Sequence, residues 1–484
     1  MEINQFEPPV LLNIQVTEKL PKQIPISIML QAGQEKKEPG QPGPDAGSIL
    51  IQKIEPSKLT LIVSTGLVSK TNPESFRIAG GSAAKWLMEN KASKAAFILS
   101  SLDNCGVDQA LEYFCEGLWL GSYQFIKYKT QEKLQACKLY LEVGNQVKAI
   151  QARLEPVQLV THAVNMARQI THEPAAVVNP LTLSKLAEAV ATKYHLTVNV
   201  LEQDSLKRMK AGALLAVGQG SKTPARLIVL EYPGSGEMTT EKPVVLVGKA
   251  VTFDTGGYSL KDADHIIGMK FDKSGGVIVL CTLMAASMLK LKQPVIGIIP
   301  TVENMVSEKA YLPDDIITSM SGKTIEVIST DAEGRLILCD ALTYAQKNYQ
   351  PKSLIDLATL TGGVITALGH VRAGLISNHK TLRLQLTECG EAVHERLWPL
   401  PLDDDYFELI KSHEADIKNV CVSREASTIV GAMFLKQFIQ DDTCWAHIDI
   451  AGTAEVDKDH PYCPKGPSGF GVRLLIDYLK KLEE

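Results

Sequence analysis

The sequence is 484 residues long, carries a formal net charge of −5 and is 45% hydrophobic. This length exceeds one compact domain and predicts two or three, with enough apolar side chains for a core in each. The slightly acidic balance argues against nucleic acid or an anionic membrane as the main partner. No apolar run is long enough to cross a membrane, and Met1–Asn4 lacks the features of a secretory signal, so we expect a cytoplasmic protein.

The cysteines and histidines argue against two common kinds of site. The nine cysteines are an odd number without a C-x-x-C pair, which disfavours both a disulfide framework and a zinc site made of thiolates. None of the ten histidines has a metal-binding spacing. Any metal must therefore be held by carboxylates, with lysine as a further candidate.

The first third of the chain predicts a small α/β domain over residues 1–150. Residues Gly33–Gly47 contain Pro-Gly pairs and predict a surface loop. A helical pattern over Val157–Ile170 predicts a connection between lobes, which we assign as linker helix and loop over residues 151–180. Within the small domain, strands are predicted at Ile24–Leu30, Leu59–Val63 and Ala95–Leu99, and helices at Ser82–Met88 and Val107–Leu118.

Residues 181–484 predict a second, larger α/β domain. Several of its strand-like runs are apolar on both faces, which is typical of a mainly parallel sheet sandwiched by helices. Such sheets bind their ligands in loops beyond the carboxyl ends of the strands. The predicted strands are Thr197–Leu201, Leu227–Leu230, Val244–Val247, Pro294–Ile299 and Ser353–Leu357.

Two charged clusters follow this pattern. The first comes after the strand Val244–Val247 and consists of Lys249, Asp254, the pair Gly256-Gly257, Lys261 and Asp272. The second lies in Ser329–Leu336, where Asp331, Glu333 and Arg335 alternate and Gly334 predicts a tight turn. A helical pattern follows over Leu336–Asn348, so Arg335 and nearby backbone N–H groups are expected at a helix N-terminus, where an anion can bind.

Together the clusters supply four carboxylates, from Asp254, Asp272, Asp331 and Glu333. Two divalent cations would balance their charge. Lys261 and Arg335 would then remain as uncompensated positive groups, suited to stabilising an oxyanion.

On these residues the sequence resembles the leucine aminopeptidase, or cytosol aminopeptidase, family of dinuclear-metal exopeptidases. Its signature is Asn-Thr-Asp-Ala-Glu-Gly-Arg-Leu, and Ser329–Leu336 differs from it only at Ser329. The resemblance covers about residues 160–484. It continues in Val247–Lys261, Met269–Asp272, Asp356–Gly363, Trp445–Gly452 and Gly469–Arg473, and begins around Ala167–Arg168 and Glu173–Ala175.

The resemblance implies a catalytic metallopeptidase domain and a homohexamer that removes residues from peptides with a free N-terminus. Asp254 and Glu333 would bridge two divalent metals, zinc or manganese in first place and magnesium or cobalt as alternatives. Lys249 and Asp272 would complete one site and Asp331 the other. Lys261 and Arg335 would be catalytic. Further implied contacts are a bicarbonate general base at Gly334, Arg335 and Leu336, and an uncharged pocket for Leu- or Met-like residues at Met269, Thr359, Gly362 and Ala451.

The sequence also departs from the family at a few positions. Ala250, Ser307, Glu308 and Asp314 stand where glycine is common, and Lys273 stands where an uncharged residue is usual. None removes a ligand, although the added methyl groups and Lys273 could shift loops or weaken the neighbouring metal. Two other functions stay open: a two-metal phosphoesterase, for which a Gly-rich phosphate loop is missing, and a weakly active family member with a binding or scaffolding role.

Overall fold

The computed structural model describes residues 3–33, 41–55, 58–102, 109–131, 133–235, 241–423 and 425–483. It divides into two compact units. The N-terminal unit comprises Pro8–Asn165 and Val456–Gly466, and the large unit comprises Met1–Glu7, Met166–Glu455 and Pro467–Glu484. Part of the predicted loop at 33–47 and the start of the predicted helix at 107–118 fall outside the described residues.

The N-terminal unit is built on a six-stranded sheet with the order β1-β6-β5-β2-β4-β3, in which only the β3–β4 pair is antiparallel. Strands β2, β4 and β5 correspond to the predicted ones. The strands are β1 (Leu12–Thr17), β2 (Ile26–Gly33), β3 (Ile49–Glu55), β4 (Lys58–Leu67), β5 (Lys94–Phe97) and β6 (Cys137–Glu142). The helices are α1 (Pro73–Glu89) and α2 (Ala110–Gly121), with single 3-10 turns η2 (Val68–Lys70), η3 (Leu99–Leu102) and η4 (Gly144–Gln146).

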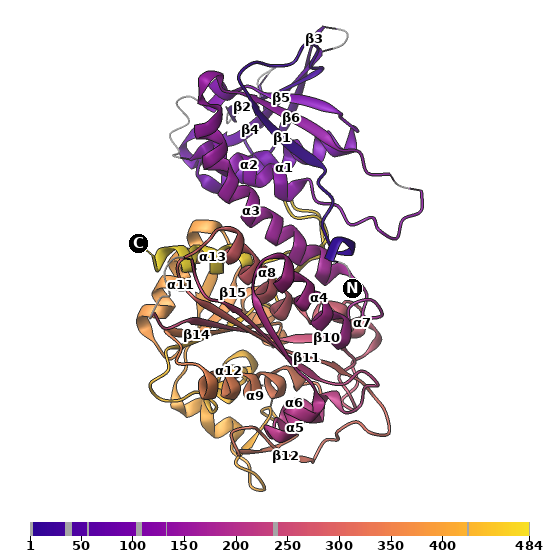
Figure 1. Ribbon diagram of the computed structural model, residues 1–484, viewed down its shortest axis with the longest axis vertical. Helices are drawn as coiled ribbons and strands as arrows, with labels where there is room; N and C mark the ends of the chain where they lie inside the picture. The colour runs from indigo at the N-terminus through magenta and orange to yellow at the C-terminus, as the bar shows by residue number, and fades with distance from the viewer. Residues whose placement is uncertain are drawn as a thin grey trace. The chain divides into compact units, whose positions relative to one another are not determined.

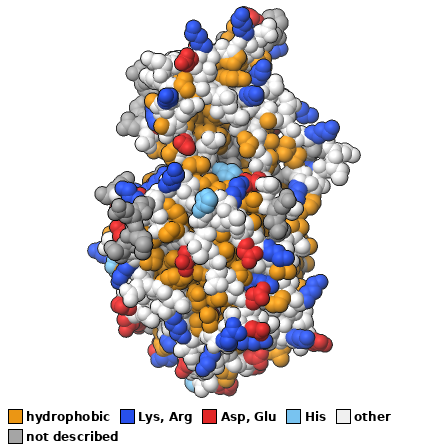
Figure 2. Space-filling model, in the orientation of Figure 1, with side chains coloured by type: hydrophobic (Ala, Val, Ile, Leu, Met, Phe, Trp, Pro, Cys, Tyr) orange, Lys and Arg blue, Asp and Glu red, His pale blue; other side chains and the backbone are white. Residues whose placement is uncertain are grey.

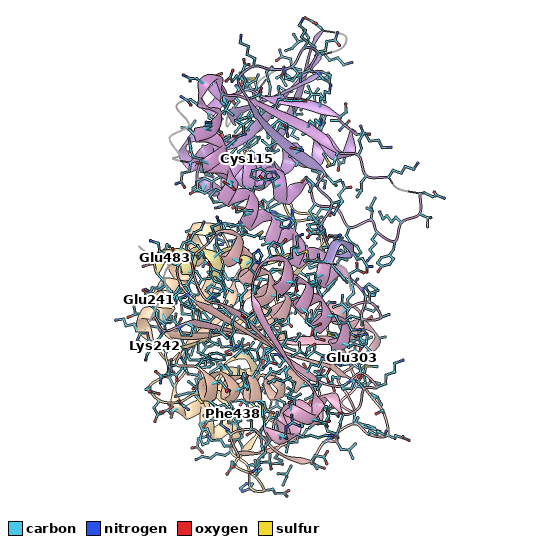
Figure 3. All side chains as sticks on the ribbon, viewed as in Figure 1. Cys115, Glu241, Lys242, Glu303, Phe438 and Glu483 are labelled. Atoms are coloured by element: carbon cyan, nitrogen blue, oxygen red, sulfur yellow. The ribbon has the colours of Figure 1, made fainter. Side chains whose placement is uncertain are left out.

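Helices α1 and α2 pack closely because each has a glycine, which carries no side chain, where the two helices meet. A Cβ atom on Gly80 would lie 2.1 Å from the Phe114 carbonyl oxygen, and one on Gly117 would lie 2.0 Å from that of Arg77. Helix α1 therefore begins nine residues before the predicted Ser82–Met88, since Gly80 serves packing here and does not end the helix. Cys115 of α2 is fully buried in the core of this unit (Figure 3).

Helix α3 (Val147–His172) carries the chain from one unit to the other. It is longer than the predicted Val157–Ile170 and contains Pro156. Its last turn is held by two lysines: Lys270 Nζ donates to the His172 carbonyl oxygen at 2.8 Å, and Lys273 Nζ donates to that of Glu173 at 3.0 Å. Cations are favourable at the C-terminus of a helix.

The large unit contains a nine-stranded sheet with the order β16-β15-β18-β14-β9-β11-β8-β7, and β10 pairs with β11 beside this path. The central pairs β18–β14, β14–β9 and β9–β11 are parallel, which confirms the predicted mainly parallel sheet. Antiparallel pairs flank them. The strands are β7 (Thr197–Leu201), β8 (Arg226–Tyr232), β9 (Val244–Gly248), β10 (Ala250–Asp254), β11 (Val295–Asn304), β14 (Ser353–Ala358), β15 (Ala373–Ser377), β16 (Leu397–Pro399) and β18 (Trp445–Asp449).

Helices cover both faces of this sheet (Figure 1). One layer contains α4 (Pro180–Lys193), α8 (Ser274–Met288), α11 (Lys380–Val393) and α13 (Val472–Lys481), and the other contains α5 (Gln203–Arg208), α6 (Gly212–Gly218), α9 (Glu333–Asn348) and α12 (Ser427–Lys436). Phe438, after α12, packs in the core of the second layer (Figure 3). Smaller elements are η1 (Ile3–Gln5), α7 (Ala263–Ile266), η5 (Met269–Phe271), α10 (Gly362–Leu368), η6 (Asp404–Ile410), β12 (Ile316–Thr318), β13 (Thr324–Glu326), β17 (Ile417–Lys418), β19 (Glu455–Val456) and β20 (Gly466–Pro467).

Among the described helices, none has both the length and the apolar character needed to span a membrane. Side chains of both charge signs are scattered over the face shown in Figure 2. This distribution agrees with the small net charge of −5.

Candidate metal centre

The predicted metal ligands come from chain segments that meet at the carboxyl ends of the central strands. Lys249 directly follows β9, and Asp254 is the last residue of β10. Asp272 directly follows the 3-10 turn η5, and Asp331 lies in the turn before α9. Glu333 is the first residue of α9, which places its carboxylate at the positive end of the helix dipole.

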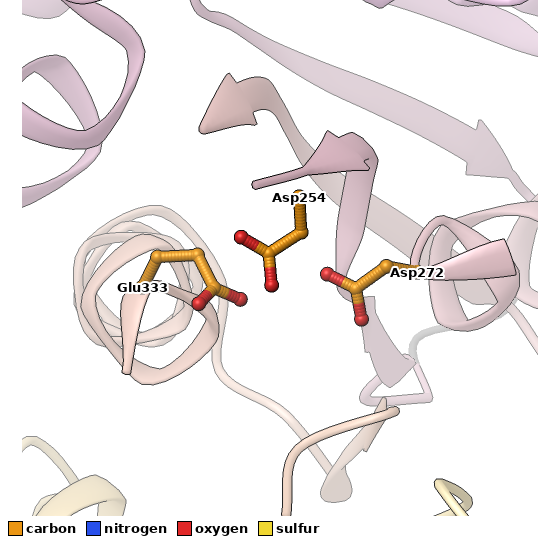
Figure 4. Close-up of side chains that lie close together, drawn as sticks. All are labelled: Asp254, Asp272 and Glu333. Atoms are coloured by element: carbon orange, nitrogen blue, oxygen red, sulfur yellow. The ribbon is translucent and has the colours of Figure 1, made fainter. Parts of the chain in front are cut away.

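Three of these carboxylates form a compact, buried group. The side chains of Asp254, Asp272 and Glu333 are turned toward one another (Figure 4), and each offers an oxygen atom within 4.8 Å of the others. Their exposed fractions are 2%, 6% and 2%. Charged side chains are this deeply buried when they are paired or bind a cation.

The two predicted lysines lie between the carboxylates. Lys249 Nζ lies 2.8 Å from both Asp272 Oδ1 and Glu333 Oε1. Lys261 Nζ lies 2.9 Å from Asp254 Oδ2 and 2.5 Å from Asp331 Oδ1. Lys261 is thus paired with two carboxylates, and the predicted uncompensated charge applies only once divalent cations neutralise these carboxylates.

The electrostatics of this cluster favour a cation. When all four carboxylates are ionised, the two ammonium groups leave two negative charges uncompensated. Burial raises the pKa of Glu333 to about 8 and that of Asp272 to about 6, so the carboxylates are destabilised as anions. Burial opposes the charge of Lys249, but the carboxylates of Asp272 and Glu333 outweigh it and raise its pKa. Asp272 Oδ2 is buried with no hydrogen-bond partner among the described residues, as expected for an oxygen that serves as a metal ligand.

The chemistry of these side chains limits which cation fits. Carboxylate oxygens with one amine form a hard ligand set, which suits magnesium, manganese or zinc better than copper(I). The residues at the centre therefore fit a divalent metal.

A cavity of about 580 Å³ opens beside the carboxylates. The four predicted pocket residues, Met269, Thr359, Gly362 and Ala451, all line it. Leu360, Ile365 and Ala454 add apolar wall to the same cavity. Its size falls within the range of small-molecule sites.

The residues predicted to bind bicarbonate do not line this cavity. Gly334, Arg335 and Leu336 are buried in the first turn of α9, and none is among the residues that line the cavity. Arg335 Nη1 donates to the Asn419 carbonyl oxygen at 2.8 Å, and Arg335 Nε has no partner among the described residues. Burial lowers the pKa of Arg335 to about 10. Its role toward an anion stays a prediction.

Gly334 is not in the tight turn that the sequence predicted. It is the second residue of α9, and the turn comes before it, at Thr330 and Asp331. A Cβ atom on Gly334 would lie 2.7 Å from Lys249 Nζ, so this position needs a residue without a side chain to let the lysine pass.

One residue at the site, Asn304, was not singled out from the sequence. It ends β11, and its Nδ2 donates to Asp254 Oδ1 at 2.8 Å and to the Thr330 carbonyl oxygen at 3.0 Å. It thereby connects the two charged clusters. Its place at the carboxyl end of a central strand is the signal that could have identified it.

Three of the departures from the family pattern, Ala250, Asp314 and Lys273, have a local structural context. Ala250 packs against Gly276, where a Cβ atom would come within 2.7 Å of the alanine methyl group. Asp314 has a φ of 72°, a backbone conformation that glycine adopts readily. Lys273 is fully buried, and its amine donates to backbone carbonyl groups of Glu173 and Lys270.

Comparisons with known proteins agree with this arrangement. Residues 165–476 match the "Cytosol aminopeptidase family, catalytic domain", and residues 43–132 match the "Cytosol aminopeptidase family, N-terminal domain". A probable cytosol aminopeptidase of Geobacter sp. (strain M21) is 44% identical over 430 residues, which are 88% of this chain and 86% of the relative. One of Cenarchaeum symbiosum (strain A) is 40% identical over 428 residues, 88% and 86% of the two chains.

Among solved structures, the bottromycin maturation enzyme BotP in complex with Mn has a TM-score of 0.87 and 27% sequence identity. The match covers 96% of this chain and 100% of that chain. From the matched domains and these relatives we conclude that the chain belongs to the cytosol aminopeptidase family, whose members are metal-dependent aminopeptidases.

Proposed function

We propose that this chain is a metal-dependent aminopeptidase that hydrolyses the N-terminal peptide bond of substrates with a Leu- or Met-like first residue. The observation that carries the proposal is the buried group of Asp254, Asp272 and Glu333 at the edge of a cavity that is also lined by the uncharged residues Met269, Thr359, Gly362 and Ala451. Family membership supports the reaction class. The alternative of a two-metal phosphoesterase is not favoured by this membership.

Five residues would hold two divalent ions. Glu333 is paired with Lys249 and Asp254 with Lys261, and the two carboxylates offer oxygen atoms within 4.8 Å of each other, which supports a role for both in holding the ions. Lys249 and Asp272 would complete one site, and Asp331 the other. When bound, such a pair of ions supplies a Lewis acid and a water nucleophile that is active at neutral pH. The manganese named for BotP supports manganese as one candidate, beside zinc, magnesium and cobalt.

Lys261 would bind the carbonyl oxygen of the scissile bond. Its side chain lines the cavity and ends between Asp254 and Asp331. Once cations satisfy those carboxylates, its ammonium group is available to stabilise negative charge on the substrate oxygen. Arg335, with the backbone N–H groups of Gly334 and Leu336, would hold a bicarbonate that accepts a proton during the reaction.

The cavity wall would select the first residue of the substrate. Met269, Thr359, Gly362 and Ala451 carry no charge, and Ile365 adds an aliphatic surface. Burying an aliphatic side chain against such a wall is worth roughly 1.5–3 kcal/mol. A Lys or Asp side chain would gain no such burial and would lose hydration.

Two assay pairs on the purified, metal-loaded protein and one DNA-binding assay test the proposal. Leu-p-nitroanilide should be hydrolysed and N-acetyl-Leu-p-nitroanilide should not, because the free amine is required. Equal rates on both would contradict an aminopeptidase. Hydrolysis of p-nitrophenyl phosphate in preference to the amide would favour the phosphoesterase, and DNA binding by an inactive Glu333→Gln protein would favour a binding role.

We further propose a cytoplasmic homohexamer. The relatives' description as cytosol aminopeptidases supports the location. Light scattering on the metal-loaded protein tests the assembly, since a monomeric mass at micromolar concentration would contradict a stable hexamer.

A further inference from the structure

The carboxylate of Asp449 organises the loop that follows β14. Asp449 is the last residue of β18 and is fully buried. Its Oδ1 accepts hydrogen bonds from the backbone N–H groups of Leu360 at 3.1 Å and Ala451 at 3.2 Å. Its Oδ2 accepts one from Thr361 Oγ1 at 2.6 Å. One side chain thus fixes three residues that line the cavity, although Asp449 does not line it.

The residue before Leu360 in this loop touches two of the proposed metal ligands. Thr359 Oγ1 donates to Asp272 Oδ1 at 2.6 Å. The Thr359 carbonyl oxygen accepts from Lys249 Nζ at 2.8 Å. The position of Thr359 therefore sets the direction of both ligands.

The strands under this loop are joined by a second buried contact. Asp356 of β14 is the register partner of His447 of β18, and His447 Nδ1 lies 2.5 Å from Asp356 Oδ1. Trp445 Nε1 donates to Asp356 Oδ2 at 2.7 Å. All three side chains are fully buried, so β14 and β18 form a firm base from which Asp449 reaches the loop.

We propose that Asp449 is a positioning residue for the metal centre. It fixes the loop Thr359–Thr361, and through Thr359 it orients Asp272 and Lys249 toward the metal that these two would share. The proposal rests on the function proposed above. Partners behind the ligands of a metal typically contribute 10–100-fold to metal affinity or activity.

Substitutions at Asp449 should therefore weaken one metal site in graded fashion. Asp449→Asn keeps one acceptor oxygen and should lower metal affinity at that site by about 10-fold, whereas Asp449→Ala removes both and should lose about 100-fold. Titration of metal-stripped protein with Mn²⁺ or Zn²⁺ by calorimetry measures this directly. The KM for Leu-p-nitroanilide should rise as well, because Leu360, Thr361 and Ala451 form part of the cavity wall.

Asp340→Asn is the matched control. Asp340 is also fully buried and also accepts from two backbone N–H groups, those of Leu214 at 2.9 Å and Met320 at 2.7 Å. It does not line the cavity. Both variants lose a buried carboxylate, so a general loss of stability affects both, whereas the change in metal affinity is expected for Asp449→Asn alone.

Thr359→Val tests the route of the effect. This substitution keeps the shape of the side chain and removes the hydroxyl group that binds Asp272. It should weaken the same metal site, and Asp449→Asn combined with Thr359→Val should lose less than the sum of the single losses, because both changes act on one contact.

The results separate the inference from the function on which it rests. Wild-type protein that binds no metal and cleaves no amide would refute the proposed function. Active wild-type protein, with Asp449→Asn and Asp340→Asn equal in metal affinity and KM, would refute the positioning role of Asp449. Full additivity of Asp449→Asn and Thr359→Val would refute the route through Thr359.

Discussion

The side chain of Lys249 lies so close to the backbone of Gly334 that no side chain fits at position 334. A Cβ atom on Gly334 would come within 2.7 Å of both Cε and Nζ of Lys249. The lysine cannot move aside freely, because its amine contacts Asp272, Glu333 and the Thr359 carbonyl oxygen at 2.8 Å each. The first turn of α9 therefore needs a glycine at position 334 to leave room for the Lys249 side chain.

Gly334→Ala should consequently lower both stability and metal binding. Alanine is favoured over glycine in a helix by only about 1 kcal/mol. Displacing Lys249 breaks its buried ion pairs with Asp272 and Glu333, which costs roughly 3–5 kcal/mol, so the Tm should fall. The displaced Lys249 should leave its site incomplete, and bound metal should fall below two per chain. Mass spectrometry of metals beside thermal melts checks this. Full metal content with normal rates would contradict the assigned place of Lys249.

The carboxylates of Asp254 and Glu333 give the next prediction. Asp254→Asn and Glu333→Gln each remove a negative charge from the buried group, so both proteins should bind fewer than two metals and lose activity. Glu303→Gln is the control, because Glu303 precedes Asn304 in β11, binds Ser221 and does not line the cavity (Figure 3). Two metals per chain in all three variants would refute the ligand assignment.

Lys261→Ala should spare the metals and reduce kcat. Removing one preorganised electrostatic donor typically costs about 10²–10³-fold in rate. Because the substitution also frees Asp254 and Asp331 from an ammonium group, metal affinity should not fall. Kinetics and metal analysis on the same samples decide the point, and a metal-depleted protein would make Lys261 a structural residue.

Arg335→Met tests the predicted bicarbonate. It keeps the apolar stem in its buried site and removes the guanidinium group, so kcat should fall by about 10²-fold, the lower range for loss of general acid–base catalysis. The wild-type rate should rise with added bicarbonate, and the rate of the variant should not. An equal response of both proteins would remove Arg335 from that role.

Asp340 should make stability depend on pH. Burial raises its pKa from 3.8 to about 7, so the folded protein binds this proton more tightly than the unfolded chain. The resulting stabilisation is complete below the unfolded pKa and is lost as the pH rises to about 7. The Tm of wild-type protein relative to Asp340→Asn should therefore fall between about pH 4 and 7. A constant difference would contradict the raised pKa.

The sequence predicted the fold class correctly where the type of side chain indicates whether the residue is buried. The central strand β9 consists of Val and Leu residues before a glycine, and its burial on both faces was predicted correctly. Strand β18 was not predicted as a strand, because His447 and Asp449 suggest a surface position. Their complete burial depends on Asp356 and on the loop at Leu360, about ninety residues away in the chain.

At the candidate site, too, the sequence predicted some features and could not predict others. The motif placed Lys249, Asp254, Asp272, Asp331 and Glu333 in one group, and the structure brings these side chains together. The spacing of the motifs could not predict which carboxylates each lysine contacts. The positions of the Nζ atoms depend on how the chain between the motifs folds. For the same reason Gly334 suggested a turn, whereas in the structure it makes room for the side chain of Lys249, which follows strand β9.

The assignment of Val456–Gly466 to the N-terminal unit has a consequence for biosynthesis. Tyr462 donates to Glu74 at 2.6 Å, and Asp459 lies 3.0 Å from Lys85, so these late residues complete contacts of α1. Domains generally fold in order as the ribosome releases them. Here the first unit stays incomplete until residue 466 has been translated, by which time all strands of the nine-stranded sheet have left the ribosome or are leaving it. The two units must therefore finish folding almost together, once residue 466 has left the ribosome.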